Sequence, residues 1–245
     1  MHIKKNIPNF VTLLNLLCGS IAVLFAVNNF FVTAALFVFL GIFFDFFDGL
    51  LARKLNVQSA LGLQLDSLAD MVTSGLVPGI ILYKLIAIAV DAPPMAASSE
   101  WSLHWSGFSM EFIPIIGLFV TLASAYRLAT FNLDEDQQAY FKGLPTPANT
   151  LLIMSLPLIM EFQDNDAING IILNKWFLIA LTLLSCYLLN SSIKLFALKF
   201  KDYSFKNNAI RYIFIILSLV LLIVLQFAAI PVIILLYILL SLISK

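Results

Sequence analysis

The sequence predicts an all-α, polytopic integral membrane protein with about eight transmembrane helices. Its 245 residues are 61% hydrophobic and 11% charged, with a mean hydropathy of +0.99. A soluble domain has roughly 45–50% apolar and about 25% charged residues. The apolar runs approach or reach the roughly 20 residues that a helix needs to cross a bilayer. They also lack the alternating pattern of membrane β-strands.

Eight apolar stretches are predicted to form the spans. They cover 8–28, 30–53, 59–90, 110–133, 147–162, 175–193, 208–226 and 229–243. The first is predicted to be a retained helix rather than a signal peptide, because no small-residue cleavage site follows it. The third, at about 1.5 Å per residue, would be roughly 48 Å long. We therefore expect it either to project into the cytoplasm or to break near Gly75 or Pro78-Gly79.

The distribution of basic residues predicts the orientation. Lysines and arginines gather before the first span and in every second loop, and they are sparse in the intervening loops. The positive-inside rule then places both termini on the cytoplasmic side of the cell (inner) membrane. The chain would divide into a core of about six spans, residues 1–193, and a basic cytoplasmic linker with two further spans, residues 194–245.

Several kinds of function are disfavoured by composition. The formal net charge is zero, so no basic field points to a nucleic-acid partner. Cys18 and Cys186 lie in apolar runs without metal-ligand spacing, and we interpret them as buried small hydrophobic residues. The two histidines are isolated from one another, so no histidine-based chemistry is indicated.

Four aspartates are the most informative feature. Asp45 and Asp48 are three residues apart, and Asp66 and Asp70 are four apart, so each pair shares one helix face. A single aspartate at membrane depth costs about 2.5–3.5 kcal/mol. Four together are most simply neutralised by divalent cations with hard oxygen ligands, such as Mg²⁺, Mn²⁺ or Ca²⁺. Solvated helix ends and a proton or ion pathway are the competing interpretations.

The residues around these aspartates resemble the CDP-alcohol phosphatidyltransferase family. That family has the signature D-x2-D-G-x2-A-R-x8-G-x3-D-x3-D, and every fixed position has its counterpart here. The matching residues are Asp45, Asp48, Gly49, Ala52, Arg53, Gly62, Asp66 and Asp70. The resemblance implies transfer of a phosphatidyl group from a CDP-linked lipid to an alcohol, with release of CMP.

The resemblance also implies roles for individual residues. The four aspartates would hold two divalent cations, Mg²⁺ or Mn²⁺, and Asp70 would act as the general base. Contacts with the CDP-lipid would come from the residues that match the family's nucleotide-binding positions, namely Asn9, Thr12, Gly49, Arg53, Ser59 and Gly62. Residues 1–193 would be the catalytic core, and the protein would be a homodimer among membrane lipids.

Several segments are similar to the phosphatidylserine synthase branch of this family, which transfers the phosphatidyl group from CDP-diacylglycerol to L-serine. They include 66–72, 127–132 and 141–148. Arg127, Asn132 and Lys142 are the predicted acceptor contacts, because serine needs a cation for its carboxylate. A departure is Thr73-Ser74-Gly75, where many members have Ser-Phe-Gly. The alternatives are a sibling transferase using glycerol 3-phosphate or inositol phosphate, and an ion or proton transporter.

Overall fold

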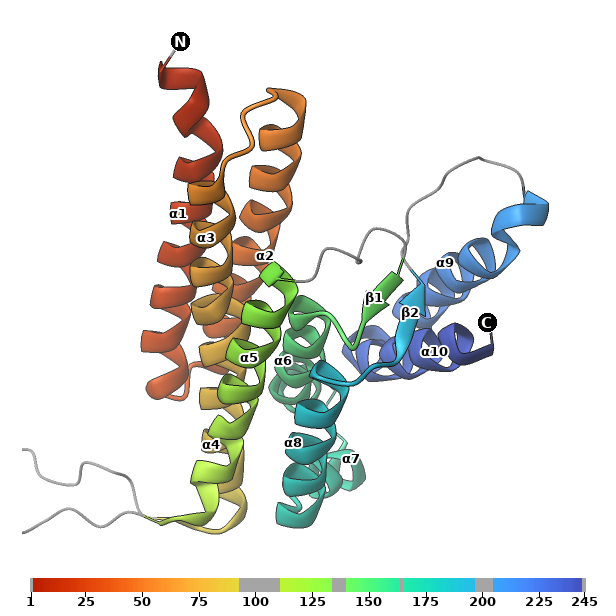
Figure 1. Ribbon diagram of the computed structural model, residues 1–245. Helices are drawn as coiled ribbons and strands as arrows, with labels where there is room; N and C mark the ends of the chain where they lie inside the picture. Colours follow the sequence, from red (N-terminus) through yellow and green to blue (C-terminus); the bar gives the residue numbers. More distant parts are fainter. Residues whose placement is uncertain (1, 93–110, 134–139, 164, 197–204, 244–245) are drawn as a thin grey trace, which may run out of the picture.

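The computed structural model describes residues 2–92, 111–133, 140–163, 165–196 and 205–243 (Figure 1). Within these ranges the protein is almost entirely helical. In chain order the elements are α1 (His2–Val27), α2 (Phe31–Lys54), α3 (Ala60–Asp70), the π-helical turn η1 (Met71–Leu76), α4 (Val77–Ala89), the 3-10 helix η3 (Ile113–Leu118), α5 (Phe119–Leu133), β1 (Tyr140–Lys142), α6 (Thr146–Phe162), α7 (Asp166–Ile172), α8 (Lys175–Leu189), β2 (Lys194–Phe196), α9 (Phe205–Leu225), η4 (Gln226–Ala228) and α10 (Ala229–Ile243).

The predicted class of a polytopic all-α membrane protein is confirmed. Among the described residues, five helical segments are long and apolar enough to cross a membrane, or six if the bent pair α7–α8 forms one span. The last of the five runs over 208–243 and contains α9, η4 and α10. Each of the eight predicted stretches is helical over most of its described residues. The number of eight crossings stays a prediction.

The third predicted span is continuous from α3 to α4, but it does not keep one helical geometry. Residues Met71–Leu76 form a π-helical turn that ends just before Pro78. In a regular α-helix the amide of residue 78 would donate to the Ser74 carbonyl, and proline has no amide proton. Thr150 Oγ1 on α6 donates to that carbonyl instead, at 2.8 Å. Neighbouring hydroxyls of this kind make irregular helix acceptable within a membrane.

The core lies between α1, α2, α4, α6 and α8. Its fully buried members include Val38, Ile81, Leu85 and Ile153. Many large apolar side chains point outward instead, for example Leu24 at 66% and Leu122 at 67% exposed, as expected of surfaces that face lipid. Helices α1, α2 and α3 lie side by side, and the start of α1 lies at the same end of the bundle as the end of α2 (Figure 1). This end carries predicted site residues such as Asn9 on α1 and Asp48 and Arg53 on α2.

Two elements were not predicted. The first is the short helix α7, and the second is an antiparallel ribbon in which β1 pairs with β2, Phe141 opposite Leu195. The ribbon joins segments more than fifty residues apart, which local sequence patterns do not reveal. It also anchors α10, because Tyr237 donates its hydroxyl proton to the Phe196 carbonyl at 2.8 Å.

Candidate active site

A cavity of about 930 Å³ opens where the start of α1, the end of α2 and the start of α3 meet. Three of the four signature aspartates line it, and Arg53 is the cation in its wall. Apolar side chains such as Phe46 and Leu63 complete the lining. The cavity therefore combines a carboxylate cluster, a permanently charged guanidinium and an apolar wall, which together suit an anionic lipid headgroup.

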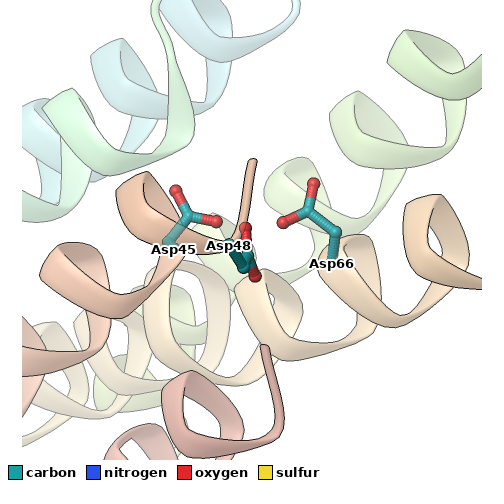
Figure 2. Close-up of side chains that lie close together, drawn as sticks. All are labelled: Asp45, Asp48 and Asp66. Carbon is teal, nitrogen blue, oxygen red and sulfur yellow. The ribbon is translucent and has the colours of Figure 1, made fainter. Parts of the chain in front are cut away.

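The carboxyl groups of Asp45, Asp48 and Asp66 converge in this cavity. One oxygen of each lies within 4.8 Å of the others, and Figure 2 shows the three side chains meeting between α2 and α3. Asp48 is only 5% exposed, and its Oδ2 has no hydrogen-bond partner. A buried carboxylate oxygen without a donor, beside two further carboxylates, is the environment that a divalent cation with hard oxygen ligands requires. The donor set thus fits such a cation.

Asp70 lies one turn beyond Asp66 and does not line the cavity. Its charge still interacts with those of Asp48 and Asp66. The side-chain amide of Asn15 on α1 donates to Asp70 Oδ1 at 3.3 Å. Sequence reasoning did not place Asn15 in the site. A usable signal existed, because Asn15 follows Thr12 by three residues and so continues the polar face of the first span.

The predicted nucleotide contacts are gathered around the same cavity. All six line it: Asn9, Thr12, Gly49, Arg53, Ser59 and Gly62. Ser59 is the N-cap of α3, and its hydroxyl oxygen accepts the Gly62 amide at 3.0 Å. A Cβ on Gly62 would lie 3.2 Å from Asn9 Oδ1, so glycine lets α1 and α3 approach at this point.

The three predicted acceptor contacts lie elsewhere. None of them lines the described cavity, although Phe131, the residue before Asn132, does. Arg127 is 8% exposed, and its Nη1 donates to the backbone carbonyls of Lys142 and Leu189 at 3.0 and 3.3 Å. Asn132 pairs with the hydroxyl of Ser67 at 2.8 Å. Arg127 thus joins the ribbon to the end of α8, a contact that sequence reasoning did not predict.

Comparison with known proteins decides the family. The family model described as CDP-alcohol phosphatidyltransferase matches residues 5–188, about three quarters of the chain. The chain belongs to the CDP-alcohol phosphatidyltransferase family. The matched region contains all the signature aspartates and the whole cavity wall. The signature predicted this family and a transferase of phospholipid biosynthesis. Both predictions are confirmed.

Several relatives within this phosphatidyltransferase family carry the name CDP-diacylglycerol–serine O-phosphatidyltransferase. The protein from Bacillus subtilis (strain 168) is 33% identical over 166 residues, which cover 67% of this chain and 80% of the relative. The protein from Methanocaldococcus jannaschii is 30% identical over 161 residues, or 65% of each chain. The one from Mycobacterium tuberculosis (strain ATCC 25618 / H37Rv) is 29% identical over 178 residues, and the match spans about 55% of its length.

Proposed function

We propose that this enzyme is a phosphatidylserine synthase, which transfers a phosphatidyl group from CDP-diacylglycerol to the hydroxyl of L-serine and releases CMP. The observation that carries the proposal is the cavity that joins three signature aspartates to Arg53. The serine acceptor is supported by the relatives in three organisms whose names specify that alcohol.

The cavity would hold the CDP headgroup. Arg53 would pair with the pyrophosphate, because a guanidinium is a permanently charged, bidentate donor to phosphate oxygens. Asn9, Thr12 and Ser59 offer polar atoms to the nucleotide, and Gly49 and Gly62 leave space for it. Phe46 lines the cavity and is 61% exposed, so the acyl chains would leave over this side chain into the lipid.

Two divalent cations, Mg²⁺ or Mn²⁺, would be held by Asp45, Asp48, Asp66 and Asp70. When bound, they would neutralise the phosphate oxygens and assist departure of CMP. The fit is supported by the unpartnered Oδ2 of Asp48 and by the 4.8 Å convergence of the three carboxylates. Asp70 would complete the set from the next turn of the same helix.

In the proposed step the serine hydroxyl oxygen attacks the β-phosphorus of CDP-diacylglycerol. A new phosphorus–oxygen bond forms, and the bond from the β-phosphorus to the bridging oxygen breaks, so that CMP leaves with both bonding electrons. Asp70 accepts the hydroxyl proton. Its position supports this role, because Asn15 holds one carboxylate oxygen and the carboxylate lies beside the aspartate cluster.

The acceptor would enter from the side of α5 and the ribbon. We propose that Asn132 and Lys142 contact serine and that Arg127 contributes charge while it holds the ribbon in place. Asn132 pairs with Ser67, the residue after Asp66, which puts it within a short distance of the aspartates. Lys142 is exposed at the end of β1, and its own backbone carbonyl accepts a hydrogen bond from Arg127.

The setting of the enzyme is proposed on the distribution of charge and on the family. The active site and both termini would face the cytoplasm, and the enzyme would work as a homodimer in the cell (inner) membrane. Residues 1–193 would form the catalytic core, followed by the basic linker and two further helices.

The test is CMP release by purified protein with CDP-diacylglycerol and Mn²⁺, with serine compared against glycerol 3-phosphate and inositol phosphate. We expect release with serine only, and its loss on addition of EDTA. Release with another alcohol would overturn the acceptor assignment and keep the transferase chemistry. No release with any alcohol from folded protein would overturn the proposal as a whole.

A further inference from the structure

A buried polar contact joins the π-helical turn to the aspartate cluster through α1. Thr73 lies in the middle of η1, and its Oγ1 donates to Asn15 Oδ1 at 2.8 Å, with the Asn15 backbone oxygen 3.2 Å away. Asn15 in turn donates to Asp70. Thr73 and Asn15 are both 0% exposed, so neither side chain has water as an alternative partner. The three residues form one chain of hydrogen bonds.

The direction of this chain is fixed by its chemistry. A carboxamide has one oxygen that accepts and one nitrogen that donates. Because the Thr73 hydroxyl occupies the oxygen of Asn15, the nitrogen must point away from Thr73 and toward Asp70. Without that hydroxyl the amide of Asn15 could rotate, and it would no longer present a donor to Asp70 in one fixed direction.

The packing around Thr73 shows how closely it is held. A Cβ on Gly19 of α1 would collide with Thr73 Oγ1, and a Cβ on Gly41 of α2 would lie 2.7 Å from Thr73 Cγ2. Glycines on two different helices therefore make room for this one side chain. In this packing the hydroxyl lies within hydrogen-bond distance of Asn15.

The π-helical turn itself is held from the other side. Thr150 donates to the Ser74 carbonyl, and Thr121 on α5 donates to the Gly75 carbonyl at 3.1 Å. In a π-helix the amide bonds to the carbonyl five residues earlier, and the amide of Val77 does so with Val72. Such turns are common at functional sites because they shift side chains relative to a regular helix. Here the turn brings Thr73 against α1.

We infer that Thr73 and Asn15 are positioning residues, which hold the Asp70 carboxylate in the orientation needed for the transfer reaction. This inference rests on the proposed function, because it takes Asp70 to act in the transfer reaction. It assigns no contact with substrate to Thr73 or Asn15. Partners that orient a ligating or catalytic carboxylate typically contribute 10- to 100-fold in activity or metal affinity.

The test compares kcat and KM for Thr73→Val, Thr73→Ser and Asn15→Ala in the purified full-length enzyme. Thr73→Val keeps the shape and removes the donor, whereas Thr73→Ser keeps the donor and removes a methyl group. We expect Thr73→Val and Asn15→Ala to lower kcat by about 10- to 100-fold, with both KM values within about twofold. Thr73→Ser should stay within about threefold of the wild type.

Thr182→Val is the matched control. Thr182 is also fully buried, but its hydroxyl donates only to the Leu178 carbonyl of its own helix. We expect wild-type kcat in this variant. The inference is overturned if Thr73→Val resembles Thr182→Val, or if Thr73→Ser loses as much kcat as Thr73→Val, because packing alone would then explain the effect. If Thr73→Val does not fold, kcat of Asn15→Ala decides alone: a tenfold loss supports the inference, and wild-type kcat overturns it.

Failure of the proposed function can be distinguished from failure of this inference. If the wild type uses an alcohol other than serine, the same comparison is made with that alcohol. If it uses none, Mn²⁺ affinity measured by calorimetry decides instead. Affinity about tenfold weaker in Thr73→Val and Asn15→Ala, but not in Thr182→Val, supports the positioning of the Asp70 carboxylate by these two residues, and equal affinity in all of them overturns it.

Discussion

The carboxylate cluster predicts that one substitution raises the stability of the metal-free protein and reduces its stabilisation by metal. Two full charges at most 4.8 Å apart repel with about 3.5 kcal/mol or more at an effective dielectric constant of about 20, and proton uptake by crowded carboxyls relieves part of this repulsion. Asp48→Asn removes the carboxyl that repels both Asp45 and Asp66 wherever these groups are ionised. The metal-free protein should therefore become more stable, by at least about 1 kcal/mol, even though the variant loses a proposed cation ligand.

The same substitution should remove the stabilisation by metal. A cation present at about 100 times its Kd stabilises the wild type by about 2.7 kcal/mol. If loss of one carboxylate weakens binding about 100-fold, the same concentration stabilises the variant by only about 0.4 kcal/mol. For a chain of this size about 1 kcal/mol corresponds to roughly 2–4 °C in Tm. We expect a wild-type shift of about 5–11 °C and a variant shift of about 1 °C.

The assay is thermal unfolding in detergent, with EDTA and with Mn²⁺. Glu161→Gln is the matched control, because Glu161 is an exposed acid near the end of α6 and away from the cluster. It should behave as the wild type does under both conditions. An Asp48→Asn variant with unchanged metal-free Tm and a full Mn²⁺ shift would refute the reasoning that these carboxylates repel one another and share a cation.

Three further substitutions test the other parts of the site. Asp70→Asn should abolish serine-dependent CMP release, because an amide cannot accept the proton, while CDP-diacylglycerol binding measured by calorimetry persists; normal turnover would exclude Asp70 as the base. Arg53→Lys should weaken CDP-diacylglycerol binding about 10- to 100-fold, since a bidentate phosphate contact becomes a point charge, and unchanged affinity would remove Arg53 from the pyrophosphate site. Arg127→Met should lower Tm, because the Lys142 and Leu189 carbonyls each lose a donor worth about 1–3 kcal/mol, and an unchanged Tm would contradict the anchoring role.

Sequence reasoning reached the helical class, the positions of the eight apolar stretches and the family, all from local information. Composition and run length report burial in lipid directly, and the spacing of Asp45, Asp48, Asp66 and Asp70 is itself the family signature. The roles of these residues stay predictions. The gathering of Asp45, Asp48 and Asp66 at one cavity was foreseeable, because span two ends where span three begins and the intervening turn is short.

The sequence could not indicate which distant groups would meet. Asn15 and Asp70 are 55 residues apart, and Thr150 and Ser74 are 76 apart, so nothing in local periodicity connects them. Arg127 shows the same limit, because its position suggested a substrate contact and its observed partners are two backbone carbonyls.

The sequence by itself therefore determined that this is a helical membrane protein and which acidic residues share a helix face. Hydrophobic length sets where helices can cross a membrane, and residue spacing sets which carboxylates share a helix face. Only the tertiary structure decided how those carboxylates are oriented. The π-helical turn, the hydroxyls of Thr121 and Thr150 that satisfy it, and the contact from Thr73 through Asn15 to Asp70 exist only after the helices pack. A hydrogen bond between helices depends on their relative placement, which no single segment encodes.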